Sequence, residues 1–132
     1  MAANRTTTHG VVLVIDDDPD LRVSIAELLR SHGYRVIEAQ HGRDGLDRLN
    51  EERPDVILLD LNMPVMDGWE FRAEQQRLVD ERLAAVPVLL CTAELDGDKH
   101  KEELNASALI EKPLDMDRVL EAVNTAVRGS LD

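Results

Sequence analysis

The sequence is poor in aromatic residues, contains a single cysteine and has no long apolar stretch. Its aromatic residues are Tyr34, Trp69 and Phe71, and this scarcity argues against a flavin site or a base-stacking surface. Cys91 lies inside an apolar run, so we expect a buried, unreactive thiol, and one cysteine cannot form an internal disulfide. No apolar stretch reaches the length of a membrane span, and residues 1–9 lack the apolar core of a secretory signal. We therefore expect a cytoplasmic protein with no membrane partner.

Positive charge is also scarce, since 15 Lys and Arg residues face 27 Asp and Glu residues and leave a net charge of −12 at pH 7. Proteins that bind DNA replace counterions with Lys and Arg, so this balance argues against direct binding of nucleic acid. It is compatible with a phosphate-bearing ligand if a divalent cation mediates the contact. The length of 132 residues predicts one globular domain. We expect the domain to span residues 10–128, with short tails at residues 1–9, which should be disordered, and 129–132.

Four apolar runs in the chain each end at a polar residue. The runs are rich in leucine and β-branched residues, which is typical of strands buried on both faces of a parallel sheet. Another such segment, residues 34–39, predicts a fifth strand. The four runs are residues 11–15 before Asp16 and Asp17, residues 56–59 before Asp60, residues 86–91 before Thr92, and residues 108–111 before Lys112.

Two predicted helices between these strands have clear start signals. Asp18 and Pro19 suit the N-cap and the first position of a helix that ends near residues 31–33. Asp67 and Glu70 have the spacing of a capping box, which opens a helix that we expect to run to about residue 83.

Three further helices are predicted from helical spacing alone. They cover residues 42–52, residues 95–104 and residues 116–127, and the second should be short and mobile because only Leu95 and Leu104 are apolar in it. Strand and helix alternate along the whole chain. This order predicts an α/β fold with a doubly wound, five-stranded parallel sheet, right-handed crossovers and helices on both faces.

The polar residues that follow the strands should meet at one edge of the sheet, because ligands of such sheets lie at the carboxyl ends of the strands. Asp16, Asp17 and Asp60 bring three carboxylates there, Thr92 a hydroxyl and Lys112 an ammonium group. Three neighbouring carboxylates repel one another unless protons or a cation intervene. Oxygen ligands of this kind suit a hard divalent ion such as Mg²⁺, which prefers few carboxylates together with waters and phosphate oxygens.

These motifs, taken in order, resemble the receiver domain of bacterial response regulators, in its single-domain, CheY-like form. The motifs are Asp16-Asp17, the segment from Asp60 to Gly68, Thr92 with Ala93, and Lys112 with Pro113, and the resemblance covers residues 11–128. It implies a flavodoxin-like sheet with the strand order 2-1-3-4-5. It also implies a two-component receiver that accepts a phosphoryl group from a histidine kinase or phosphotransfer protein and switches a surface read by a downstream protein. No other enzymatic activity is implied.

The resemblance assigns a role to each residue at the site. Asp60 would be the phosphoacceptor, and Asp17 and Asp60 would ligate Mg²⁺ directly. Asp16 would act through a water molecule on the ion, and Asn62 would offer its main-chain carbonyl. Asn62 and Glu94 would also flank the path of the attacking water and so tune dephosphorylation.

Lys112 and Thr92 would complete the catalytic set by pairing with phosphoryl oxygens, and the Lys112–Pro113 peptide bond should be cis. Thr92 and Leu109 occupy the switch positions. Because many family members carry Tyr or Phe where Leu109 stands, we expect reordering of residues 95–104 to replace an aromatic readout. Asn105 stands where Gly is common, and Asn tolerates the left-handed backbone that such a turn requires.

Other interpretations of the same residues exist. The main alternative is a phosphohydrolase with an aspartyl-phosphate intermediate. The pattern that such enzymes resemble has a second Asp, a general acid, two residues after the nucleophile, where this chain has Asn62. The chain also has no cap insertion that could form a substrate pocket. A flavodoxin-like cofactor binder lacks stacking aromatics. Without the family, the acidic pair could be solvated loop carboxylates, Thr92 a strand end and Lys112 a surface lysine. The remaining candidates, which we expect to face solvent, are His9, His32, His41 and His100.

Overall fold

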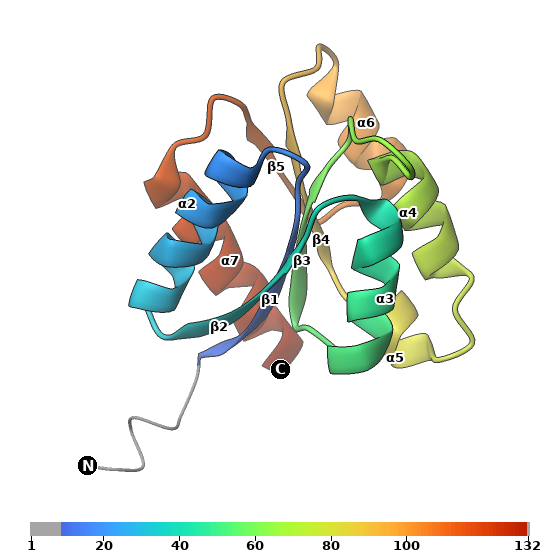
Figure 1. The fold of residues 1–132 in the computed structure, drawn as a ribbon, viewed down its shortest axis with the longest axis horizontal. Helices are drawn as coiled ribbons and strands as arrows, with labels where there is room; N and C mark the ends of the chain where they lie inside the picture. Colours follow the sequence, from blue (N-terminus) through green and yellow to red (C-terminus); the bar gives the residue numbers. More distant parts are fainter. Residues whose placement is uncertain (1–8, 132) are drawn as a thin grey trace.

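The computed structural model describes residues 9–131, and its centre is one sheet of five parallel strands in the order β2-β1-β3-β4-β5 (Figure 1). This confirms the predicted fold class and strand order. The strands are β1 (Gly10–Ile15), β2 (Tyr34–Ala39), β3 (Val56–Asp60), β4 (Val88–Thr92) and β5 (Ala108–Glu111). The helices are α2 (Pro19–Ser31), α3 (Gly42–Glu52), α4 (Gly68–Gln76), α5 (Glu81–Ala84), α6 (Gly97–Leu104) and α7 (Met116–Leu131).

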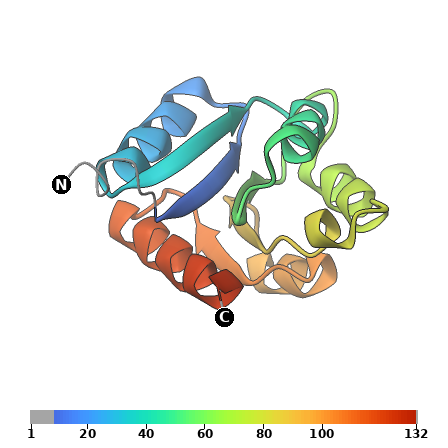
Figure 2. The same cartoon turned by 90° about the horizontal axis from the view of Figure 1, so that it is seen from below.

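Helices cover both faces of the sheet. Seen from below, α2 and α7 lie on one side and α3, α4, α5 and α6 on the other (Figure 2). Side chains alternate along β1 between the two resulting cores, so that Val12 and Val14 pack toward α2 and α7, and Leu13 and Ile15 pack toward α3 and α4. Because both faces are buried, β1, β3 and β4 have the uninterrupted apolar sequences seen above.

The two predicted helix starts are confirmed. The Asp18 side chain accepts hydrogen bonds from the main-chain N–H groups of Asp20 and Leu21, and Pro19 is the first residue of α2. Asp67 and Glu70 form the reciprocal pair of a capping box at the start of α4. The acidic loop and the phosphoacceptor loop therefore each lead into a helix whose first turn is held by local hydrogen bonds.

The third helix is shorter than predicted. It ends at Gln76 instead of running to about residue 83, and Asp80 starts the separate short helix α5. The buried Gln75 side chain donates to the carbonyl groups of Leu83 and Val86, which turns the chain back beneath α4. Strand β4 begins at Val88, later than predicted, since the amide of Val86 bonds to the carbonyl of Leu83.

The tail predicted for residues 1–9 falls outside the described residues except for His9, and α7 continues as far as Leu131. Within residues 9–131, no helix is long and apolar enough to cross a membrane. Cys91 is buried in β4, and burial raises the pKa of its thiol to about 12, so the thiol is protonated at neutral pH, as an unreactive cysteine should be.

Candidate functional site

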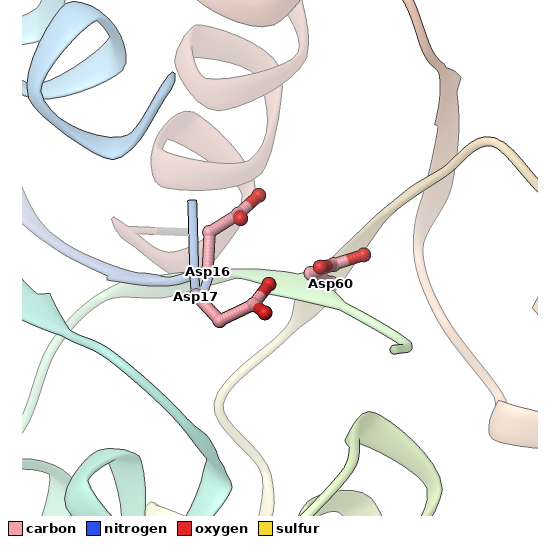
Figure 3. Close-up of side chains that lie close together, drawn as sticks. All are labelled: Asp16, Asp17 and Asp60. Carbon is pink, nitrogen blue, oxygen red and sulfur yellow. The ribbon is translucent and has the colours of Figure 1, made fainter. Parts of the chain in front are cut away.

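Three carboxylates converge at the carboxyl ends of the adjacent strands β1 and β3 (Figure 3). Asp16 and Asp17 directly follow β1, and Asp60 is the last residue of the neighbouring strand β3. One carboxylate oxygen from each residue lies within 4.8 Å of the others. Asp16 is 3% exposed and Asp60 7% exposed, whereas Asp17 is open to solvent. The structure thus brings together the acidic residues that the sequence predicted to meet.

Lys112 balances part of this negative charge. It follows β5, and its Nζ lies 3.1 Å from Asp16 Oδ2 and 3.4 Å from Asp60 Oδ1. Burial lowers the pKa of Lys112, but the charges of Asp16 and Asp60 outweigh burial, so its pKa lies above the ordinary value. The ammonium group is therefore protonated at neutral pH and bridges the two buried carboxylates. The peptide bond between Lys112 and Pro113 is cis, as predicted.

The Asp60 carboxylate lies in surroundings that disfavour its charged form. Burial and, next, the charge of Asp16 raise its pKa to about 6, while Lys112 acts in the opposite direction and Asp17 adds a smaller upward effect. At neutral pH the group is mainly ionised, but ionisation costs more free energy than for an exposed aspartate. A cation placed among these oxygens would lower that cost.

Thr92 lies at the carboxyl end of β4 and is 1% exposed. Its Oγ1 accepts a hydrogen bond from the main-chain N–H of Glu94 at 3.0 Å, which leaves the hydroxyl proton available for donation. The Glu94 side chain is exposed on the loop after β4, and Asn62 is exposed on the loop after β3. These two residues border the site without belonging to the acidic cluster.

The loop from Asp60 to α4 approaches the strand end closely. The Gly68 N–H donates to the Leu61 carbonyl at 2.8 Å, and a Cβ atom at Gly68 would lie 2.4 Å from the Asp60 carbonyl oxygen. Only glycine fits there, which explains its place in the motif. In the same loop Val65 has φ of 67° and is 77% exposed, a strained backbone for a β-branched residue.

Leu109 belongs to a small apolar cluster beneath α6. Like Trp69, it packs against a buried group that includes Leu104, and a Cβ atom at Gly97 would lie 2.9 Å from its Cδ2. His100 was expected to face solvent, and this prediction was wrong. Its ring meets Trp69 edge-on with centroids 5.0 Å apart, and its Nδ1 is buried without a hydrogen-bond partner among the described residues.

Sequence reasoning missed one residue that touches the acidic loop. Arg22 on α2 donates from Nη1 to the main-chain carbonyl of Asp16 at 2.7 Å, and from Nε to Glu38 at 3.2 Å. The sequence around Arg22 does not indicate these contacts, because one partner is the main-chain carbonyl of Asp16 and the other is Glu38 on β2. Only its position one turn into the helix after the acidic pair could have indicated the contact.

The donor set of the cluster is compatible with a hard divalent cation. All three groups offer carboxylate oxygens, close enough together to share one ion, and no sulfur or imidazole group is part of the cluster. The chemistry of the cluster therefore favours Mg²⁺ or a similar ion over a soft transition metal.

Comparisons with known proteins agree with this site. A model of the response regulator receiver domain matches residues 12–124. Sporulation initiation phosphotransferase F of Bacillus subtilis is 33% identical over 112 residues, which are 85% of this chain and 89% of that protein. Protein PilH of Pseudomonas aeruginosa is 31% identical over 121 residues, which are 89% of this chain and 98% of that protein.

A solved structure shows the same fold. The chemotaxis response regulator CheY4 of Vibrio cholerae matches with a TM-score of 0.80 at 30% identity, over 91% of this chain and 99% of that chain. Sequence, fold and relatives agree. The chain belongs to the response regulator receiver domain family of two-component signalling proteins.

Proposed function

We propose that this receiver accepts a phosphoryl group on Asp60 from a histidine kinase or a histidine phosphotransfer protein. The receiver domain in this proposal spans residues 10–128. The observation that carries the proposal is the position of the Lys112 ammonium group between the buried carboxylates of Asp16 and Asp60, at the carboxyl ends of the strands. Burial raises the pKa of Asp60 to about 6, so this carboxylate is both mainly ionised at neutral pH and poorly stabilised as an anion.

The transfer is an in-line displacement at phosphorus. A carboxylate oxygen of Asp60 attacks the phosphorus atom, the bond from phosphorus to the donor nitrogen breaks, and the leaving imidazole takes up a proton. The product is a mixed anhydride on Asp60. Little covalent chemistry is required of the protein beyond the nucleophile, so positioning and charge neutralisation govern the rate.

Lys112 and Thr92 are suited to stabilise the transferred group. The Lys112 ammonium would pair with one phosphoryl oxygen, and the Thr92 hydroxyl would donate to another, since its oxygen already accepts from the Glu94 amide and its proton is available. This second contact would draw the loop after β4 toward the site. Thr92 is therefore a catalytic and a switch residue in this proposal.

Mg²⁺ would neutralise charge between the nucleophile and the phosphoryl oxygens. Asp17 and Asp60 would bind the ion directly, Asp16 through an intervening water, and Asn62 through its main-chain carbonyl. The oxygen-only cluster supports this ligand set. Asp17, which is exposed, needs the smallest rearrangement to bind an ion that arrives from solvent.

The output would be a change of surface recognised by a downstream protein partner. Leu109 lies under the N-terminal end of α6, so a shift of the loop after Thr92 would alter the packing of Leu109 against Gly97. The domain would catalyse only its own phosphorylation and dephosphorylation. In dephosphorylation a water molecule attacks the phosphoryl group, inorganic phosphate leaves, and the exposed Asn62 and Glu94 side chains would flank the path of this water.

Intact-mass measurement after incubation with acetyl phosphate and Mg²⁺ tests the proposal. One phosphoryl mass should appear on the wild-type protein and be absent from Asp60→Asn, whereas labelling of the variant to the wild-type level would overturn the assignment of Asp60. Sustained turnover of a generic phosphomonoester would favour the alternative phosphohydrolase. Arg43→Gln, an exposed position on α3, is a suitable control that should label normally.

A further inference from the structure

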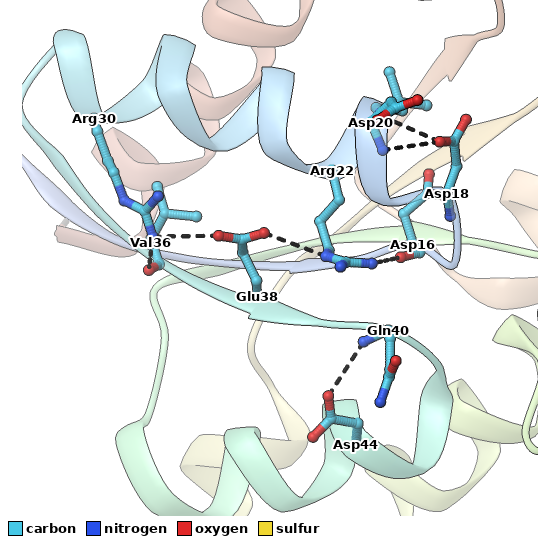
Figure 4. A network of polar contacts seen from close by, with 10 residues as sticks. Asp16, Asp18, Asp20, Arg22, Arg30, Val36, Glu38, Gln40 and Asp44 are labelled. Atoms are coloured by element: carbon cyan, nitrogen blue, oxygen red, sulfur yellow. Dashed lines mark hydrogen bonds and ion pairs between the residues drawn. The ribbon is translucent and has the colours of Figure 1, made fainter.

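A charged network reaches the acidic loop from the side of α2 and β2 (Figure 4). Arg22 is its central member, with a side chain that is 17% exposed. Its Nη1 donates to the Asp16 main-chain carbonyl at 2.7 Å, and its Nε donates to Glu38 Oε1 at 3.2 Å. The Arg22 side chain thus contacts the main chain of the acidic loop, while it forms its ion pair with Glu38, a residue outside the acidic cluster.

Glu38 holds this guanidinium from β2. Its side chain is 29% exposed, and its second oxygen, Oε2, lies 3.5 Å from Arg30 Nη2. Arg30 is itself attached to β2 through a hydrogen bond to the Val36 carbonyl at 3.1 Å. Two arginines thus share the Glu38 carboxylate, and of the two it is Arg22 that also bonds to the acidic loop, at the Asp16 carbonyl.

Asp16 is held at several points. Its amide donates to the Ala39 carbonyl at 3.1 Å, its Oδ1 accepts from the Asp18 amide at 2.9 Å, and its Oδ2 faces Lys112. Its carbonyl lies just beyond β1, where Arg22 supplies a donor. A buried carbonyl without a donor costs about 1–3 kcal/mol, so this bond favours one orientation of the peptide that joins Asp16 to Asp17.

Arg22 carries a positive charge, so the groups with which its guanidinium pairs affect cation binding at the acidic cluster. A guanidinium paired with a carboxylate of the acidic cluster would occupy the oxygens that a divalent cation needs. The observed arrangement avoids this competition, because Glu38 and the Asp16 carbonyl receive the hydrogen bonds from Nε and Nη1. Positive charge stays close to the acidic loop without covering the ligand oxygens.

We propose that Arg22, oriented by Glu38, is a positioning residue for the divalent cation. It fixes the main chain at Asp16 so that the carboxylates of Asp16 and Asp17 face Asp60, and Glu38 keeps the guanidinium away from them. This inference rests on the proposed function for the role of the ion. It concerns the affinity of the protein for the ion, which is measured without any phosphoryl transfer.

Calorimetric titration with MgCl₂ in the absence of a phosphodonor tests the inference. Arg22→Met keeps an unbranched apolar stem and removes the guanidinium donors, and should weaken Mg²⁺ binding about tenfold, the scale seen when a group that orients metal ligands is lost. Glu38→Gln should weaken it as well, since the released guanidinium can pair with Asp16 or Asp17. The double variant should bind no more weakly than Arg22→Met alone, because the Arg22 guanidinium, which lies beside the acidic loop, is then absent and cannot compete.

Arg30→Met is the matched control. Arg30 contacts the same carboxylate and the same strand but does not touch Asp16, so this variant should change Mg²⁺ affinity less than about twofold and lower only the melting temperature. If Arg22→Met and Arg30→Met lower the melting temperature alike and both keep wild-type Mg²⁺ affinity, the network is merely structural and the inference is overturned. Should Arg22→Met not fold, Arg22→Lys is the second variant, since it retains the charge but has only one donor group. Wild-type Mg²⁺ affinity in both Arg22→Lys and Glu38→Gln would then reject the inference.

Labelling with acetyl phosphate separates this inference from the proposed function. At saturating Mg²⁺, Arg22→Met should reach the wild-type extent of labelling, because its defect lies in the affinity for the ion. Absence of labelling in the wild-type protein would reject the proposed function, while the Mg²⁺ titrations would still decide the role of Arg22.

Discussion

The buried guanidinium of Arg72 on α4 donates a hydrogen bond from Nε to the main-chain carbonyl of Leu104, the last residue of α6, at 2.9 Å. A second bond, from Nη2 to the Asn105 carbonyl, measures 3.0 Å, and a third, from Nη1 to the Gln75 side chain, measures 2.7 Å. Arg72 thus caps the C-terminal end of α6 from a neighbouring helix. Asn105 itself has the left-handed backbone expected of this turn, with φ of 53°. The helix after Asp60 is therefore connected directly to the helix after Thr92.

Arg72→Met should destabilise the protein strongly. Its side chain is 6% exposed, so the substitution leaves buried carbonyl groups without donors and should lower the free energy of unfolding by about 2–4 kcal/mol. Urea denaturation at pH 7.5 measures this change. Arg77→Met, in the exposed turn that ends α4, should cost less than about 0.5 kcal/mol. A similar small cost for both variants would show that the Arg72 bonds contribute little.

The elements whose local pattern determines them were predictable from the sequence. The apolar runs gave five strands because both faces of each central strand are buried, and the caps at Asp18 and Asp67 marked two helix starts. The acidic cluster followed from these strands, because parallel strands end at one edge of the sheet. Asp16, Asp17, Asp60 and Lys112 therefore met as expected.

Contacts between distant segments were not predictable. The end of α4 depends on Gln75, whose amide holds two carbonyl groups of the α5 segment. Arg22 bonds to one main-chain carbonyl and Arg72 to two, and such carbonyls exist at every position and leave no sequence pattern. For Arg72 the available signal was its helical spacing with Gln75 beside Phe71, since polar residues on an apolar face must find buried partners.

Asp60→Asn should stabilise the metal-free protein at neutral pH. Burial raises the pKa of Asp60 from 3.8 to about 6, so between these values the native state keeps a proton that the unfolded chain has released. Stability therefore falls as pH rises through this window. The variant removes the penalty and should gain about 1–3 kcal/mol at pH 7.5 in EDTA.

The gain should decline as the pH falls below 6 and vanish near pH 4, which denaturant titrations across this range would measure. Asp47→Asn, at an exposed position on α3, serves as the control and should show no such trend. A gain that is constant from pH 4 to pH 7.5 would contradict the assignment of a raised Asp60 pKa.

Asp17→Ala should weaken metal binding, whereas Asp18→Ala should lower the stability of the fold. Asp17 is exposed and offers a carboxylate to the cluster, so its loss should weaken Mg²⁺ binding more than about tenfold and leave the fold intact or more stable. Asp18 caps α2, and its loss should cost about 1 kcal/mol of stability. Mg²⁺ affinity should then change little. Calorimetry and thermal melts of both variants decide this, and unchanged Mg²⁺ affinity in Asp17→Ala would refute its role as a ligand.

Apolar residues in place of Asn62 and Glu94 should prolong the life of the phosphorylated state. Both side chains are exposed on the two loops beside Asp60, where they would flank the attacking water. The double variant Asn62→Leu/Glu94→Leu should lengthen the lifetime at least about threefold, a barrier increase of about 0.7 kcal/mol. The decay of the phosphoryl mass after removal of acetyl phosphate measures this lifetime. Glu51→Leu, exposed on α3, should leave it unchanged, and an equal lifetime in the double variant would exclude the proposed role.

The N-terminal half of α6 should be the element that activation affects most. Asp96 precedes the helix with φ of 63° and makes no side-chain cap, and Leu104 is the one buried residue of α6. Helices gain most of their stability from a buried apolar face, so amide hydrogens near Gly97 should exchange fast in the unmodified protein. Those near Leu104 should exchange more slowly, because Arg72 holds that end.

Hydrogen exchange measured by mass spectrometry tests this gradient in α6. Beryllofluoride with Mg²⁺, which mimics the phosphoryl group, should slow exchange near Gly97, because the Thr92 hydroxyl would then hold the preceding loop. Exchange in α3, which buries Leu46 and Leu49, should not change. In Thr92→Ala the mimic should no longer slow exchange in α6, because this variant lacks the hydroxyl that would hold the preceding loop. Uniformly strong protection of α6 before activation would rule out this readout, since a helix that is already rigid has no disordered state for the phosphoryl group to order.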